Sequence, residues 1–212
     1  MSQRNPHDAL RREALRLHER YHRELIERFS VCPWAKPARA GGRTRAHVVT
    51  DASCKLEELA PVLADWANDP AVDVAFVIAP RFAAGSEAFA QWATSLAEGQ
   101  AGTFFSAAFY PSAAESAGSI QFLRQSPDPT VQLVRRTRLE EIRAQDPPHY
   151  ADIFDLDLQS LNTRKAPQSV AASVVSHNAR MLEREGRAEI QRILDDIRED
   201  RERSYARLMP LL

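Results

Sequence analysis

Residues Val72 to Ala79 read VDVAFVIA, and this stretch decides the fold prediction. The run is almost continuously apolar and rich in β-branched residues, which is typical of a strand covered on both faces. Strands of that kind occur mainly in parallel sheets whose faces carry helices. We therefore expect this segment to be the central strand of an α/β domain.

Strand and helix patterns alternate on both sides of this segment. Before it, we expect a strand at Ala46–Thr50 and a helix at Leu56–Trp66. After it come a helix at Ser86–Leu96 and strands at Thr103–Tyr110 and Val131–Arg135. The predicted order is βαβαβ, then a loop, then β, in a mainly parallel or mixed sheet of about four strands flanked by helices.

The carboxyl ends of the predicted strands are where ligands of such sheets gather. Those ends carry Asp51, the pair Pro80–Arg81 and the pair Tyr110–Pro111. A binding site built by this fold is therefore expected near those residues.

Long helices are expected at both ends of the chain. Asp8 reads as the N-cap of an amphipathic helix that continues to about Phe29. Ser169–Glu185 and Arg187–Leu208 read as two helices around Gly186, which suits a helix C-terminus. The charged C-terminal region, 187–212, alternates charge signs and is expected to present a solvated helix face.

Length and composition narrow the class of protein. The 212 residues suit one α/β domain over 1–212, and the 44% of hydrophobic residues suffice for a core. A net charge of -1 gives no sign of a nucleic-acid partner, and no run approaches the roughly 18 apolar residues of a membrane span. The lack of such a run predicts no membrane partner. The two cysteines, Cys32 and Cys54, form no CxxC pair and suggest no disulfide framework, so we expect a cytoplasmic protein.

The segment Cys32–Pro37 (CPWAKP) is the first candidate for chemistry. Its prolines are expected to hold it irregular and extended. If Lys36 folds back beside Cys32, its ammonium lowers the pKa of the thiol and makes a nucleophile. The alternative is that Cys32 is a buried small apolar residue, because free cysteines are among the most buried residue types.

A second candidate is the stretch Arg124–Thr130 (RQSPDPT), in which two prolines make a rigid loop. Arg124 with the hydroxyls of Ser126 and Thr130 would form a seat for a carboxylate or a phosphate. The alternative is an ordinary turn with a solvent-facing arginine. The sequence leaves open whether either proline follows a cis peptide bond.

A third candidate is His18-Glu19-Arg20-Tyr21-His22, which formally matches HExxH. Two histidines four residues apart share a helix face and can chelate zinc, with Glu19 as general base. Only 17 residues precede the pair and no third ligand follows, so a zinc protease is disfavoured. Packing of His18 and His22 against the core is the simpler interpretation. Apart from such a metal ion, no cofactor is expected, because dinucleotide, P-loop and dithiol motifs are lacking.

Four segments together carry a family resemblance. They are CPWAKP at Cys32–Pro37, FYP at Phe109–Pro111, RQSPDPTVQLVR at Arg124–Arg135 and NARMLEREG at Asn178–Gly186. With these segments the chain resembles an uncharacterised bacterial family, domain of unknown function 1415 (DUF1415). The match spans most of residues 10–190, and residues 145–170 look like an insertion relative to the family.

The resemblance implies which residues matter without implying a reaction. Residue by residue it carries over to Cys32, Pro33, Lys36, Arg124, Ser126, Pro127, Pro129, Thr130, Arg135 and Asn178. Two histidines usual in the family are Tyr110 and Gln132 here. The resemblance therefore implies that any chemistry of those histidines is lost or has moved, to His18, His22 or His177.

These observations lead to three hypotheses of different classes. In the first, Cys32 is the nucleophile of an enzyme, Lys36 favours its thiolate, and a small anionic or carboxylate-bearing molecule is the substrate. The predicted substrate-binding residues are Arg124, Ser126, Thr130, Arg135, Asn178 and Tyr110. The second is a non-catalytic module whose amphipathic terminal helices self-associate or dock a partner. The third is a metal-binding protein that uses His18 and His22.

Overall fold

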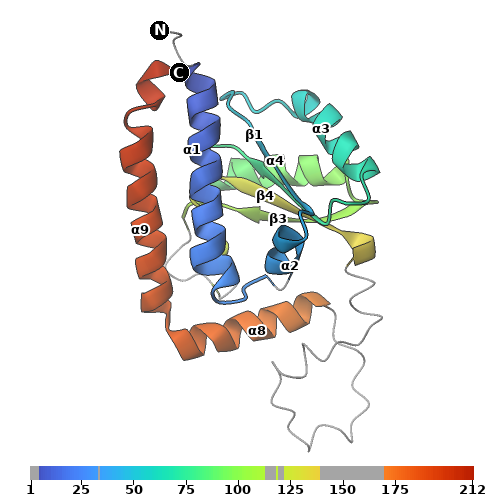
Figure 1. Ribbon diagram of the computed structural model, residues 1–212, viewed down its shortest axis with the longest axis vertical. Helices are drawn as coiled ribbons and strands as arrows, with labels where there is room; N and C mark the ends of the chain where they lie inside the picture. Colours follow the sequence, from blue (N-terminus) through green and yellow to red (C-terminus); the bar gives the residue numbers. More distant parts are fainter. Residues whose placement is uncertain (1–4, 33, 113–117, 119–121, 139–169) are drawn as a thin grey trace, which may run out of the picture.

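The computed structural model describes residues 5–32, 34–112, 118, 122–138 and 170–212 (Figure 1). Its elements are α1 (Pro6–Tyr21), a π-helix η1 (His22–Glu27), α2 (Ala35–Ala40), β1 (Thr44–Val48), α3 (Leu56–Asn68), β2 (Val74–Ile78), α4 (Gly85–Glu98), β3 (Phe104–Phe109), β4 (Thr130–Arg135), α8 (Val170–Glu185), α9 (Arg187–Tyr205) and η3 (Met209–Leu211). The predicted α/β class with long helices at both ends is confirmed.

The sheet has four strands in the order β1-β2-β4-β3. β1 and β2 run parallel, whereas β4 is antiparallel to both β2 and β3, so the sheet is mixed. All five residues of β2 are buried. The prediction that VDVAFVIA contains a central strand is therefore confirmed.

The two faces of the sheet are covered by different helices (Figure 1). Residues of α3 and α4 pack with Val77, Val131 and Leu133 on one face. On the other face, Ala14 of α1 and Ala38 of α2 pack with Val74 and Phe76 of β2. Because side chains alternate along a strand, Phe76 and its neighbours Ala75 and Val77 belong to opposite layers of the core.

The N-terminal helix differs from its prediction at both ends. Asn5 caps it, and the Asn5 side chain accepts a hydrogen bond from the backbone N–H of His7 at 3.0 Å. Asp8 lies inside the first turn, where a carboxylate also favours the helix dipole. The α-helix stops at Tyr21 and the chain continues as the π-helix η1.

The segment Cys32–Pro37 is less irregular than expected, because α2 begins at Ala35. Pro37 lies in the first turn of this helix, where a missing backbone donor costs no intrahelical hydrogen bond. The break between η1 and α2 includes Ser30, whose φ is 52°. The predicted insertion at 145–170 lies outside the described residues, apart from its last residue.

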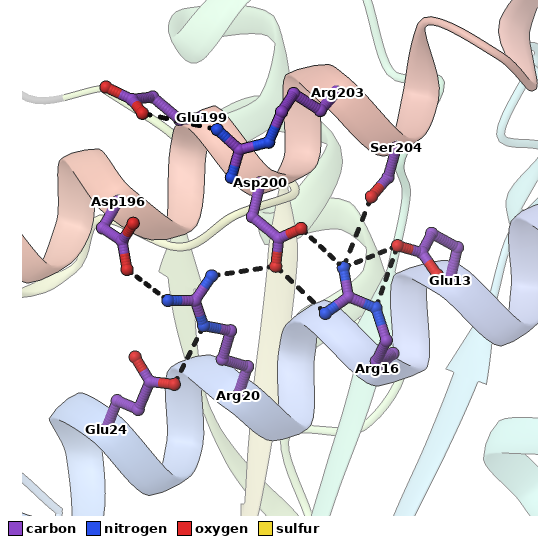
Figure 2. A network of polar contacts seen from close by, with 9 residues as sticks. All are labelled: Glu13, Arg16, Arg20, Glu24, Asp196, Glu199, Asp200, Arg203 and Ser204. Atoms are coloured by element: carbon purple, nitrogen blue, oxygen red, sulfur yellow. Dashed lines mark hydrogen bonds and ion pairs between the residues drawn. The ribbon is translucent and has the colours of Figure 1, made fainter.

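The terminal helices pack against each other (Figure 2). Arg16 and Arg20 of α1 form ion pairs with Asp200 of α9 at 3.0 and 2.8 Å, and Arg20 also pairs with Asp196. Apolar residues of both helices share buried clusters beside this network, among them Leu10, Leu17, Tyr21, Ile190, Ile193, Ile197 and Tyr205. The apolar stripes of α1 and α9 are therefore buried inside the molecule. None of the helices in the described part of the chain has the length and apolar character needed to cross a bilayer.

Candidate functional site

The Cys32 thiol contacts the fourth strand rather than the Arg124 side chain. Gln132 of β4 donates a hydrogen bond from Nε2 to the Cys32 Sγ at 3.7 Å. Gln132 is itself buried, and Cys32 packs against an apolar cluster that includes Tyr21, Leu25 and Ala35. The segments Cys32–Pro37 and Arg124–Arg135 of the sequence analysis therefore meet through Gln132.

The electrostatic surroundings of Cys32 are opposite to those expected. Burial raises the pKa of the Cys32 thiol, and hydrogen bonds from Gln132 and from the backbone of Trp34 and Ala35 offset only part of this effect. Lys36 is exposed on α2 and is not among the groups that shift the Cys32 pKa. The expected thiolate beside Lys36 is therefore not what the geometry provides.

Alkylation tests this finding. We expect Cys32 to react with iodoacetamide more slowly at pH 8 than a free cysteine, with a rate that is still rising above pH 9, because the thiolate is the nucleophile. The rate at each pH is measured by mass spectrometry of the Cys32 peptide. Cys54 serves as an internal reference, since burial raises its pKa to about 11. A rate for Cys32 that levels off below pH 8 would contradict the raised pKa.

The proline loop is shaped by the hydroxyls that were expected to bind a ligand. Ser126 and Thr130 donate from Oγ and Oγ1 to the backbone carbonyl of Asp128, at 2.6 and 2.8 Å. Both side chains are buried, whereas Arg124 is exposed. All peptide bonds of the described residues are trans, so both prolines of the loop are trans. The seat predicted from Arg124, Ser126 and Thr130 is not assembled.

Arg135 also has a structural role. Its guanidinium donates to the carbonyls of Trp66, Asp69 and Val72 at 2.7, 2.7 and 2.6 Å. It also lies 4.9 Å from the centre of the Phe104 ring. Because these carbonyls end α3 and lead into β2, Arg135 caps that helix and is not placed to bind a substrate.

The other predicted binding residues lie apart from one another. Tyr110 follows β3, with its ring 5.7 Å from that of Phe89 on the α4 side of the sheet. Asn178 is buried on α8, and its Oδ1 finds no hydrogen-bond partner among the described residues. His177, on the same helix, is partly buried, and burial lowers its pKa.

A cavity of about 280 Å³ lies between the proline loop and α9. The loop contributes Gln125, Ser126 and Pro127, and α9 contributes Leu194, Ile197, Arg198, Arg201 and Glu202; Tyr21, Pro111 and Ser112 complete the lining. Of the predicted site residues, only Ser126 lines this cavity. Its walls combine apolar side chains with two guanidinium groups and the carboxylate of Glu202.

The two arginines connect α9 to the ends of the strands. Arg198 donates to the carbonyl of Pro111, just beyond β3, at 3.3 Å and to Gln125 Oε1 at 3.4 Å. Arg201 donates to the carbonyl of Pro80, just beyond β2, at 3.4 Å. The cavity therefore lies at the carboxyl ends of β2 and β3, where the strand pattern placed ligand binding.

Asp128 holds the loop and α9 together. This carboxylate is 1% exposed, and it accepts hydrogen bonds from Arg201 Nε and from the Tyr205 hydroxyl, both at 2.7 Å. Burial raises the pKa of Asp128, although the Arg201 charge and the hydrogen bond from Tyr205 act in the opposite direction. The ion pair positions Arg201 at the rim of the cavity.

Arg198, Arg201 and Gln125 were not among the site residues predicted from the sequence. The two arginines belong to the run that was interpreted as a solvated helix face. Their spacing of three residues, on the same side as Leu194 and Ile197, was the available sign that they face inward. Nothing in the local pattern pointed to Gln125, because its partner Arg198 is 73 residues away.

Comparisons with family models, with curated proteins and with solved structures find no match to this chain. The fold and the cavity therefore define it only as an α/β protein with an arginine-lined pocket.

Proposed function

We propose that the protein binds a small carboxylate-bearing molecule in the cavity between residues 125–127 and α9. The observation that carries the proposal is the presence of two guanidinium groups, Arg198 and Arg201, against one carboxylate, Glu202, in a cavity that also has apolar walls. Guanidinium groups bind carboxylates through paired hydrogen bonds, and pockets for small molecules usually combine apolar walls with a few placed polar groups.

Both guanidiniums keep donors for such a ligand. Within the described residues, Nε of Arg198 and Nη1 of Arg201 make no hydrogen bond, while their other nitrogens are used by Asp195, Asp128 and backbone carbonyls. These fixed contacts hold the two groups in place before a ligand arrives, which lowers the cost of ordering them on binding. Tyr21, Leu194 and Ile197 supply the surface for the apolar part of the ligand.

The ligand class is the one expected from the sequence, but the proposed binding residues lie on α9 instead of at Arg124. The cavity lining does not include Cys32, so the proposal gives the thiol no nucleophilic role. Docking of a partner through the terminal helices is less favoured, because α1 and α9 bury their apolar stripes against each other. On the four segments quoted above we also propose membership of the DUF1415 family, which by itself names no ligand.

The proposal is tested by calorimetric titration of the full chain with a panel of mono- and dicarboxylates of four to eight carbons and with inorganic phosphate. We expect at least one carboxylate to bind, and Arg198→Gln to weaken it about 10-fold to 100-fold, since hydrogen bonds to charged groups contribute about 1.5–3 kcal/mol.

Arg203→Gln is the matched control, because Arg203 lies on the same helix with its side chain 65% exposed and outside the cavity. Its affinity should equal that of the wild type. Equal affinities of wild type and Arg198→Gln, or no binding across the panel, would refute the proposal.

A further inference from the structure

A second cavity, of about 370 Å³, lies on the other side of α1 from α9, at the edge of the sheet formed by β1 and β2. His18 and His22 line it together with Glu19, Phe76, Arg39 and Arg45. It shares no lining residue with the cavity between the proline loop and α9. The two cavities are therefore separate sites in the structure.

The two histidines are held close together at its wall. Their ring centres are 4.4 Å apart, and each ring packs edge-on against Phe76, at 4.5 Å for His18 and 4.7 Å for His22. Both side chains are only 8% exposed, and Phe76 belongs to the buried strand β2. The rings are thus fixed by the core, one helical turn apart.

His18 lacks the hydrogen-bond partners that a buried imidazole requires. Neither Nδ1 nor Nε2 of His18 has a partner among the described residues. A neutral imidazole has one donor and one acceptor nitrogen, and leaving a buried polar group unpaired costs about 1–3 kcal/mol. Buried polar atoms in folded proteins are almost always paired, so the two ring nitrogens of His18 are available to a ligand or to water.

The charged groups around the cavity are already balanced. Arg39 binds Glu27 at 2.6 Å and lies 3.7 Å from Glu19, and Arg45 lies 3.4 Å from Asp69. These pairs leave no unopposed charge that would select an anion here. The unsatisfied groups of the cavity are imidazole nitrogens, which are preferred ligands of zinc and related divalent ions.

We propose that His18 and His22 together bind a divalent transition-metal ion such as Zn²⁺ in this cavity. Zn–N bonds are about 2.0–2.1 Å long, so two nitrogens that share one ion lie within about 4 Å of each other. The ring centres are 4.4 Å apart, so both imidazoles are within reach of one ion. The described residues contain no group of three or more metal-ligating side chains, so within this part of the chain the proposal rests on two protein ligands.

The test uses the untagged full chain, stripped with EDTA and desalted, and titrated with Zn²⁺ by calorimetry. We expect one equivalent to bind. His22→Gln should weaken binding at least about tenfold, because the site has only two protein ligands. His47→Gln is the matched control, since His47 lies on β1 outside the cavity lining and should not alter the affinity.

Nitrogen-15 spectra of the wild-type imidazoles give a measurement that does not depend on folding of a variant. The signals of His18 and His22 should shift on addition of Zn²⁺, while that of His47 stays unchanged. No binding by the wild type would mean that water alone satisfies His18, and would overturn the proposal. Zinc binding that leaves the His18 and His22 signals in place would overturn it as well.

Discussion

Asp128→Ala should lower the free energy of unfolding by about 3–5 kcal/mol, because removing one partner of a buried ion pair leaves the other without compensation. Asp128 is 1% exposed and accepts hydrogen bonds from both Arg201 and Tyr205, so Tyr205 would lose its acceptor and Arg201 would keep the carbonyl of Pro80 but lose its counter-charge. Urea unfolding at pH 7 measures the change. Asp196→Ala is the control, because Asp196 pairs with Arg20 at a position 57% exposed and should change stability by less than about 1 kcal/mol.

A double variant shows how much of the lost stability comes from an unpaired charge and how much from lost packing at the Asp128–Arg201 pair. Burial raises the pKa of Asp128 despite the nearby Arg201, which indicates that the pair does not fully repay its desolvation. Replacing both partners, as in Asp128→Leu with Arg201→Met, should therefore recover more than about half of the stability lost in Asp128→Ala. If the double variant is no more stable than Asp128→Ala, the explanation by an uncompensated charge is wrong.

Arg135→Lys should lower the free energy of unfolding by roughly 2–4 kcal/mol, because a compact ammonium cannot replace a planar fork that serves several carbonyls. Arg135 donates to Trp66, Asp69 and Val72, which join α3 to β2. Chemical unfolding of the variant measures this change. Affinity for the carboxylate should stay at the wild-type level, since Arg135 lies outside that cavity.

Arg136→Ala is the comparison for this prediction. The Arg136 guanidinium lies 3.8 Å from the centre of the exposed Phe105 ring, and a cation–π contact with such a surface ring contributes about 0.5–1 kcal/mol. Equal losses in the two variants would show that Arg135 does not cap α3. If a folded Arg135→Lys protein no longer bound the carboxylate, Arg135 would be a ligand-binding residue, as the sequence predicted.

The main helices and strands of this fold could be predicted from the local sequence pattern. The apolar run at 72–79 marked the buried strand β2, and period-3.6 patterns marked α3 and α4 to within about two residues at their ends. The antiparallel placement of β4 was not accessible. It depends on the chain between β3 and β4 and on pairing between residues such as Ile78 and Thr130, which are far apart in sequence.

The candidate site could be predicted from the sequence only in part. The sequence singled out both the proline loop and the end of β3, and both border the cavity. It assigned the ligand to Arg124, which is exposed, and the nucleophile to Cys32, whose burial raises the pKa of its thiol. Both outcomes are alternatives that the sequence left open. The choice between them is set by packing with distant helices, which residue type and spacing do not report.

Local pattern was enough to establish an α/β domain with helices at both ends, because the period of apolar residues reports which face of each element is buried. Only the assembled fold decided which polar side chains meet. Arg198 and Arg201 reach the proline loop, and His18 and His22 face a cavity, because α1 and α9 pack side by side on one layer of the sheet. Such encounters join residues many positions apart, and their geometry follows from the packing of whole elements.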